Sequence, residues 1–278
     1  MKQVTALVPT GYGLNCDYET LFCLRSAGAA AYPVHINEMI ASAGGGPGHR
    51  LDNYDILVLG GGFSWADDHG AGVVMAAKLR RHLGDDIARF IEDGKLIMGI
   101  CNGFQVLVNL GLLPGLDGDY TARKVALAAN KSGNFIDTWV KLKVEQDSPC
   151  VYLAGISELE LPIRHGEGRL YAADEVIEQL EANKQVALRY AGMKGEPAGG
   201  AWPANPNGSV NDIAGICDPT GRVFGLMPHP EAFNHFTNHP HWTIRKESLR
   251  RRGMADVPEE GDGIAVFRNA VQYAMKMK

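Results

Sequence analysis

The sequence predicts an α/β fold in which one open, mostly parallel sheet is flanked by helices and extended by antiparallel strands. Two observations lead to this prediction. Short, unbroken apolar runs such as residues 55–59 end in glycine-rich loops, as central parallel strands do. Segments with an apolar helical face, such as residues 103–110, alternate with these runs.

The first half of the chain alternates predicted strands with predicted helices. Strands are predicted at residues 4–9, 32–36, 55–59 and 95–100. Helices are predicted at residues 18–27, 72–93 and 103–110, with Asp17 capping the first and Gly111 closing the last. Alternating segments within residues 139–161 predict antiparallel additions to the sheet. The later elements are helices at 174–181 and 264–277 and strands at 185–190, 213–217 and 223–227.

The domain organisation follows from what the sequence lacks. No internal repeat and no proline-rich or serine-rich linker divides the chain, so residues 1–278 are predicted to form one domain. Two stretches are predicted to be excursions from it, at about residues 117–134 and 235–262. The second carries Arg250, Arg251 and Arg252 in what reads as polar loop sequence.

Composition excludes several classes of protein. Lysine and arginine number 27 against 32 aspartate and glutamate, a net charge of −5, so nucleic acid is not an expected partner. No apolar stretch is long enough for a signal peptide or a membrane span, which predicts a cytoplasmic protein. The five cysteines are scattered without CxxC spacing, which argues against a disulfide framework and a structural zinc site.

The sharpest chemical signal is the segment Gly99-Ile100-Cys101-Asn102-Gly103, between a predicted strand and a predicted helix. It has the pattern of a nucleophile elbow with cysteine as the nucleophile. The helix N-terminus favours the thiolate form of Cys101. The backbone N–H of Asn102 would face a developing oxyanion, and a second N–H is expected from Gly62 or Phe63 in the glycine-rich loop that follows another strand.

A thiol nucleophile needs a base, and His229 is the candidate because it follows the apolar strand at residues 223–227. Glu231 alternates to the same side of an extended chain and would orient the imidazole as the third member of a triad. Taken singly, each residue also has an ordinary interpretation, because free cysteine is mostly core and proline-flanked carboxylates are mostly solvated. Their combination with the glycine-rich loop favours the triad.

These segments resemble the class I, Cys-His-Glu glutamine amidotransferases. Within that class they are most similar to the glutaminase subunits of phosphoribosylformylglycinamidine synthase, over most of the chain. The matching segments are residues 14–18 (LNCDY), 61–64 (GGFS), 99–113 (GICNGFQVLVNLGLL), 165–168 (HGEG), 205–216 (NPNGSVNDIAGI) and 225–231 (GLMPHPE).

The resemblance implies a flavodoxin-like sheet and glutamine hydrolysis through a thioester on Cys101, with His229 as acid and base and Glu231 supporting it. It also implies that Gln105 contacts the glutamine. The ammonia would pass to a synthetase subunit, possibly with a small adaptor subunit, for the ATP-dependent formation of an amidine in purine biosynthesis. No cofactor is implied in this chain, since ATP and Mg²⁺ would belong to the synthetase partner.

The chain departs from the family pattern at two places. Small subunits usually continue GGFS with Tyr-Gly-Asp, where this chain has Trp65-Ala66-Asp67-Asp68, and residues 130–140 look more like the fused, large form of the enzyme. Two other readings stay open. The chain could be a glutaminase for another ammonia-using synthetase, or a non-catalytic relative that binds a partner or senses oxidants through its thiol.

Two further signals are set aside. The glycine-rich loops contain no GxxxxGK[ST] and no helix-opening GxGxxG, so nucleotide binding by this chain is not expected. The cluster His235, His239 and His241 fits no standard zinc spacing, and a polar loop is the simpler interpretation. No metal site is therefore predicted.

Overall fold

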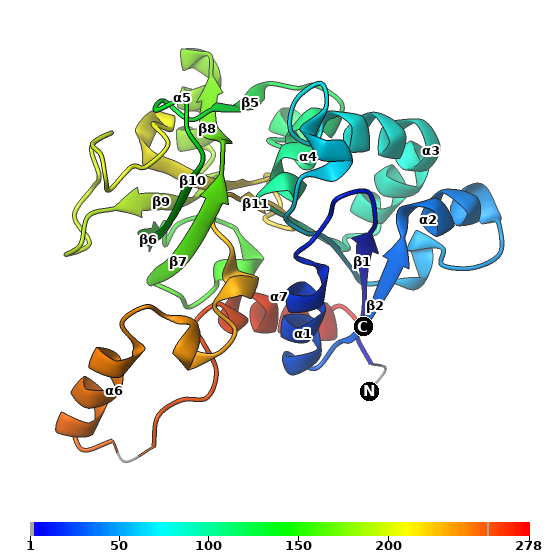
Figure 1. The fold of residues 1–278 in the computed structure, drawn as a ribbon. Helices are drawn as coiled ribbons and strands as arrows, with labels where there is room; N and C mark the ends of the chain where they lie inside the picture. The colour runs from blue at the N-terminus through cyan, green and yellow to red at the C-terminus, as the bar shows by residue number, and fades with distance from the viewer. Residues whose placement is uncertain (1–2, 255) are drawn as a thin grey trace.

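A computed structural model of the chain describes residues 3–254 and 256–278. Its main sheet has nine strands in the order β2-β1-β3-β4-β11-β10-β9-β6-β7 (Figure 1). Five neighbouring strands run parallel: β2 (Ala30–His35), β1 (Thr5–Thr10), β3 (Ile56–Leu59), β4 (Leu96–Ile100) and β11 (Val223–Leu226). Four antiparallel strands extend them: β10 (Ile213–Cys217), β9 (Val186–Ala191), β6 (Ile136–Val144) and β7 (Glu158–His165). The predicted fold class is confirmed.

Helices cover both faces of the parallel half. One face carries α1 (Asp17–Ser26) and α7 (Ile264–Lys276), and the other carries α2 (Ile36–Ser42), α3 (Val73–Glu92) and α4 (Asn102–Leu110) (Figure 1). The antiparallel half is accompanied by α5 (Asp174–Ala182) and by a small sheet of β5 (Val125–Ala129) and β8 (Glu167–Ala172). None of the helices in the described part of the chain is both long and apolar enough to cross a bilayer.

Several local predictions differ from the structure. The second strand ends at His35, because Ile36 begins α2, which the sequence analysis did not predict. Cys16, not Asp17, is the N-cap of α1, and no side chain caps this helix. Residues 117–134 contain β5, which pairs with β8.

The prediction of a polar loop around Arg250 and Arg251 is wrong, because both residues lie in α6 (Trp242–Arg251). This helix projects from the body of the protein (Figure 1) and has no buried side chain. Glu247 forms ion pairs of 2.9 Å with both arginines, at helical spacings of three and four residues. A helix without a buried face has no apolar periodicity, so the sequence carried no signal for it.

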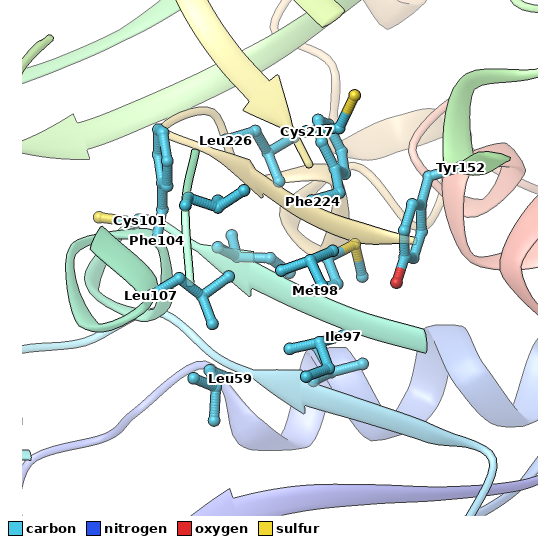
Figure 2. Packing of buried hydrophobic residues seen from close by; sticks show 14 of the residues in the cluster. Leu59, Ile97, Met98, Cys101, Phe104, Leu107, Tyr152, Cys217, Phe224 and Leu226 are labelled. Carbon is cyan, nitrogen blue, oxygen red and sulfur yellow. The ribbon is translucent and has the colours of Figure 1, made fainter. Parts of the chain in front are cut away.

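The core beneath the predicted nucleophile is closely packed (Figure 2). Cys101 lies at one end of a layer of side chains from β3, β4, β11 and α4, which includes Leu59, Met98, Phe104 and Leu226. Helix α4 approaches the strands so closely that a methyl group on Gly103 would lie 1.9 Å from the carbonyl oxygen of Leu59. Glycine at position 103 is therefore what allows the helix to start against the sheet.

We expect Gly103→Ala to lower the free energy of unfolding by about 3 kcal/mol, because the added methyl group forces α4 away from β3. Urea denaturation followed by circular dichroism measures this. The matched control is Gly84→Ala in α3, where a methyl group meets no atom within 4 Å and should stabilise by about 0.5–1 kcal/mol. Equal effects of the two substitutions would contradict the packing argument.

Candidate active site

A pocket of about 460 Å³ opens beside the carboxyl ends of the parallel strands, where open α/β sheets hold their ligands. Its walls come from the loops that follow β1, β3, β4 and β11 and from the turn between β7 and β8. Five of the predicted site residues line it: Cys101, Gln105, Gly62, Phe63 and His229. The other two adjoin it, since Asn102 follows Cys101 and Glu231 contacts His229.

Cys101 lies in the turn between β4 and α4 with a backbone φ of 51° and ψ of −104°. A non-glycine residue rarely has a positive φ, and such a conformation costs about 1–3 kcal/mol. Glycine on either side permits the turn, because a methyl group on Gly99 would lie 2.6 Å from the carbonyl oxygen of Gly103. The thiol is almost fully buried and donates a hydrogen bond of 3.6 Å to the carbonyl oxygen of Arg164.

His229 and Glu231 form a buried pair behind the thiol. His229 follows β11, and the short 3-10 helix η7 (Pro230–Ala232) turns Glu231 back so that its Oε1 lies 2.5 Å from Nδ1 of His229. Burial by itself lowers the pKa of His229, but Glu231, and then Cys101, raise it well above its ordinary value. Nε2 of His229 is buried without a hydrogen-bond partner among the described residues, so it is free to exchange a proton with a thiol.

The candidate oxyanion donors differ in availability. Asn102 opens α4, so its N–H belongs to the first helical turn, whose amide groups have no partner within the helix. Phe63 was predicted as a donor, but its N–H donates 3.1 Å to the carbonyl oxygen of Gly13. Gly62 makes no such donation within the described backbone. The geometry therefore favours Gly62 over Phe63 as the loop donor.

The side chain of Asn102 ties the turn at Cys101 to the loop after β3. Its Oδ1 accepts from the N–H of Ser64 at 3.3 Å, and its Nδ2 donates to Asp67 at 3.1 Å and to Gln105 at 3.0 Å. In this loop Trp65, Ala66 and Asp67 all have positive φ values of 53–56°. Burial, and then the nearby Glu167, raise the pKa of Asp67.

Gln105 continues this polar wall of the pocket. Its Oε1 accepts from Asn102, and its Nε2 donates 2.5 Å to the carbonyl oxygen of Glu167. The side chain is almost fully buried and still borders the pocket, consistent with the substrate contact that the resemblance implied. Both polar groups of the amide are therefore oriented before any substrate binds.

His165, which lines the pocket from the end of β7, was not among the predicted site residues. It lies in the HGEG segment, and that match was its only sequence signal. Its Nδ1 is 3.1 Å from Oδ1 of Asn130, while its Nε2 has no hydrogen-bond partner among the described residues. Burial, and then the neighbouring His229, lower the pKa of His165 to about 3. The ring is therefore neutral at ordinary pH.

Cys16 also lines the pocket, from the N-terminus of α1. Its Sγ lies 3.9 Å from Nδ1 of His229. Burial raises the pKa of the Cys16 thiol, against a smaller lowering effect of its contact with His229. The sequence predicts no role for Cys16, although this residue falls in the LNCDY segment.

The structure does not gather His235, His239 and His241 into a ligand cluster within its described residues. His239 is buried, packs edge-on against Trp139 and lies 3.2 Å from Glu160. His235 accepts a hydrogen bond from the N–H of Thr237 at the start of a short 3-10 helix. The interpretation of this segment as a polar loop is thus wrong for His239, which is part of the core packing.

Comparison with known proteins agrees with this architecture. The sequence model of one protein family, the CobB/CobQ-like glutamine amidotransferase domain, matches residues 3–274, which is nearly the whole chain. The chain belongs to this glutamine amidotransferase family.

The individual relatives define the branch of the family. A protein of Methanococcus maripaludis named phosphoribosylformylglycinamidine synthase subunit PurQ is 44% identical over 97% of both chains. The PurQ subunit of Dehalococcoides mccartyi is 43% identical over the full length of both. A chain in the solved structure of PurLQS from Thermotoga maritima is 31% identical, with a TM-score of 0.68, and covers 98% of this chain and 99% of its own. The resemblance to these glutaminase subunits is confirmed.

The low pKa of His165 predicts a specific loss of stability in acid. The unfolded chain binds a proton on this histidine below its ordinary pKa of about 6.5, whereas the folded chain does so only near 3. Between about pH 7 and about pH 5 we expect the free energy of unfolding to fall by about 2 kcal/mol more in the wild type than in His165→Gln. Urea denaturation at both pH values measures the difference.

The matched control for this prediction is His82→Gln, at an exposed position of α3. It should show the wild-type dependence on pH. A His165→Gln variant that loses as much stability as the wild type would contradict the assignment of a buried, neutral imidazole.

Proposed function

We propose that this chain is the glutaminase subunit of phosphoribosylformylglycinamidine synthase and that Cys101, His229 and Glu231 carry out the hydrolysis. One observation supports the catalytic assignment most directly. Nδ1 of His229 is held by Glu231, while its buried Nε2 is left without a partner in the pocket that Cys101 also lines. This is the arrangement of a base that is oriented by one neighbour and serves another.

In the first step, Sγ of Cys101 attacks the carboxamide carbon of glutamine and the carbonyl electron pair moves to the oxygen. The backbone N–H groups of Asn102 and Gly62 stabilise this oxyanion. His229 takes the thiol proton and passes it to the nitrogen as the carbon–nitrogen bond breaks. Ammonia leaves, and a γ-glutamyl thioester remains on Cys101.

In the second step, His229 accepts a proton from a water molecule that attacks the thioester carbon. The intermediate collapses, the sulfur–carbon bond breaks, and the thiol recovers its proton while glutamate leaves. Glu231 stabilises the imidazolium that forms in both steps. The raised pKa of His229 has this origin, because the carboxylate favours the charged ring.

The ammonia serves a synthetase partner. The relatives of this chain are named as a subunit, and the solved structure is that of PurLQS, so this chain supplies one part of a larger enzyme. The synthetase would use ATP and Mg²⁺ to activate formylglycinamide ribonucleotide, and ammonia would displace phosphate to give the amidine. The chemistry in this chain uses only side-chain and backbone groups.

We expect Cys101→Ala to lower glutamine-dependent amidine synthesis by the assembled enzyme at least about 10³-fold, while synthesis from ammonia stays near the wild-type rate. The measurement is product formation with glutamine or with ammonium salt, together with glutamate release by the chain with and without synthetase, ATP and formylglycinamide ribonucleotide. Cys150→Ala is the matched control, since this buried thiol lies outside the pocket.

Three outcomes of that experiment separate the alternatives. Loss of both activities in an intact Cys101→Ala complex would contradict the division of labour between the subunits. Glutamate release that never responds to this synthetase would assign the chain to another ammonia-using enzyme. No release under any condition would favour a non-catalytic relative.

Glu231→Gln should lower kcat for glutamate release by about 10²–10⁴-fold, because the amide no longer stabilises the imidazolium. Removing the carboxylate also lowers the pKa of His229, and a base is active in its unprotonated form, so the acidic limb of the kcat profile should move to lower pH. Glu178→Gln, at an exposed position of α5, is the control. An unchanged profile would refute the role assigned to Glu231.

A further inference from the structure

Three side chains that can bind metal ions meet beside the nucleophile. Cys16, His229 and Glu231 are all buried, and one ligand atom from each lies within 4.8 Å of the others. Cys16 lies at the N-terminus of α1, His229 lies in the loop between β11 and η7, and Glu231 lies in η7. Among the described residues, no other group of three histidine, cysteine or acidic side chains satisfies this distance.

The spacing of these atoms is close to that of a metal site. Sγ of Cys16 lies 3.9 Å from Nδ1 of His229, and tetrahedral zinc with ordinary bond lengths would hold sulfur and nitrogen about 3.6 Å apart. Nδ1 of His229 and Oε1 of Glu231 are 2.5 Å apart, and tetrahedral zinc would hold nitrogen and oxygen about 3.4 Å apart, so the carboxylate would have to move away from the ring by about 0.9 Å. Glu231 is fully buried, and its Oε2 has no hydrogen-bond partner among the described residues. One carboxylate oxygen is thus left free to coordinate.

The chemistry of the three groups also selects the ion. Thiolate, imidazole and carboxylate together are ligands of zinc, whereas magnesium and calcium prefer oxygen alone. Cys16 and His229 both line the pocket, so an ion can reach them from solvent. The glutaminase mechanism gives Cys16 no task, although its sulfur lies against the catalytic imidazole.

We propose that Cys16, His229 and Glu231 form a zinc-binding site and that the bound ion inhibits the enzyme. Zinc binds Nδ1 of His229 in place of its proton, and the Cys16 thiol gives up its proton to become the second ligand. Glu231 then coordinates the metal instead of the imidazole. The ring can no longer act as the base for Cys101. The inhibitory part of this proposal rests on the proposed glutaminase function, whereas the binding part does not.

The decisive question is which thiol holds the metal. We would add Co²⁺, a spectroscopic substitute for Zn²⁺, to the full chain and record the thiolate-to-cobalt charge-transfer band. The expected result is a band in the wild type, in Cys101→Ala and in the distant control Cys150→Ser, and no band in Cys16→Ser. Circular dichroism confirms that Cys16→Ser is folded.

Other patterns of this band would overturn the site. A wild type without a band, or a band that is lost in Cys101→Ala and kept in Cys16→Ser, would place no metal on Cys16. Cys101→Ala leaves Cys16 unaltered, so loss of the band in this variant would contradict the site even if Cys16→Ser fails to fold.

Affinity for Zn²⁺ is measured by competition with a chromophoric chelator. Loss of one ligand should weaken binding more than about tenfold in Cys16→Ser and in His229→Asn, since even indirect partners of a metal site contribute that much. Equal affinity of Cys16→Ser and the wild type would contradict the proposal.

Inhibition is tested on glutamate release by the wild-type chain. Zn²⁺ should abolish release, and a chelator should restore it. Cobalt and zinc binding without any glutaminase activity would sink the proposed function and leave the metal site standing. Glutaminase activity that is insensitive to Zn²⁺, with no cobalt band, would contradict the metal site and support the proposed function.

Discussion

The close approach of α4 to β3 is the constraint on which the rest of the site depends. Gly103 allows the helix backbone to contact the carbonyl of Leu59, and Gly99 leaves room for the turn that holds Cys101 at a positive φ. The energy needed to hold that conformation is supplied by the buried layer of β3, β4 and β11 beneath it (Figure 2). The strained turn leaves the thiol at the start of α4 and in the wall of the pocket, which the loop after β3 also lines.

The buried pair of Glu231 and His229 is held together by electrostatic attraction. Glu231 is fully buried, and a buried carboxylate is stable only beside a compensating group, which is His229. The pair gives the imidazole its orientation and its affinity for a proton. His165 lines the same pocket but has no such carboxylate beside it and stays neutral. Two buried histidines in one pocket therefore differ in their affinity for a proton because of one neighbour.

Much of this arrangement could be predicted from the sequence, because the signals are local. Short apolar strands, a glycine on each side of Cys101 and a histidine after the strand at 223–227 each reflect a constraint within a few residues. Cys16 and His165 carry no such local signal, since their roles arise from contacts with residues far along the chain. The hydrogen bond from Phe63 to Gly13 is equally non-local. Helix α6 could not be predicted for a different reason: it buries no side chain, so its sequence has no apolar periodicity.

The tether made by Asn102 has a consequence for how such an enzyme can change over time. One side chain links the turn at Cys101 to a loop in which Trp65, Ala66 and Asp67 hold left-handed conformations. Replacing Asn102 would release that loop and disturb Gln105 at once. The loop sequence and the residue after the cysteine therefore constrain each other, because a substitution in one removes hydrogen-bond partners of the other. A substituted loop keeps this link only when it still presents a backbone N–H at position 64 and a carboxylate at position 67 to Asn102. This requirement limits which loop sequences are compatible with the turn at Cys101.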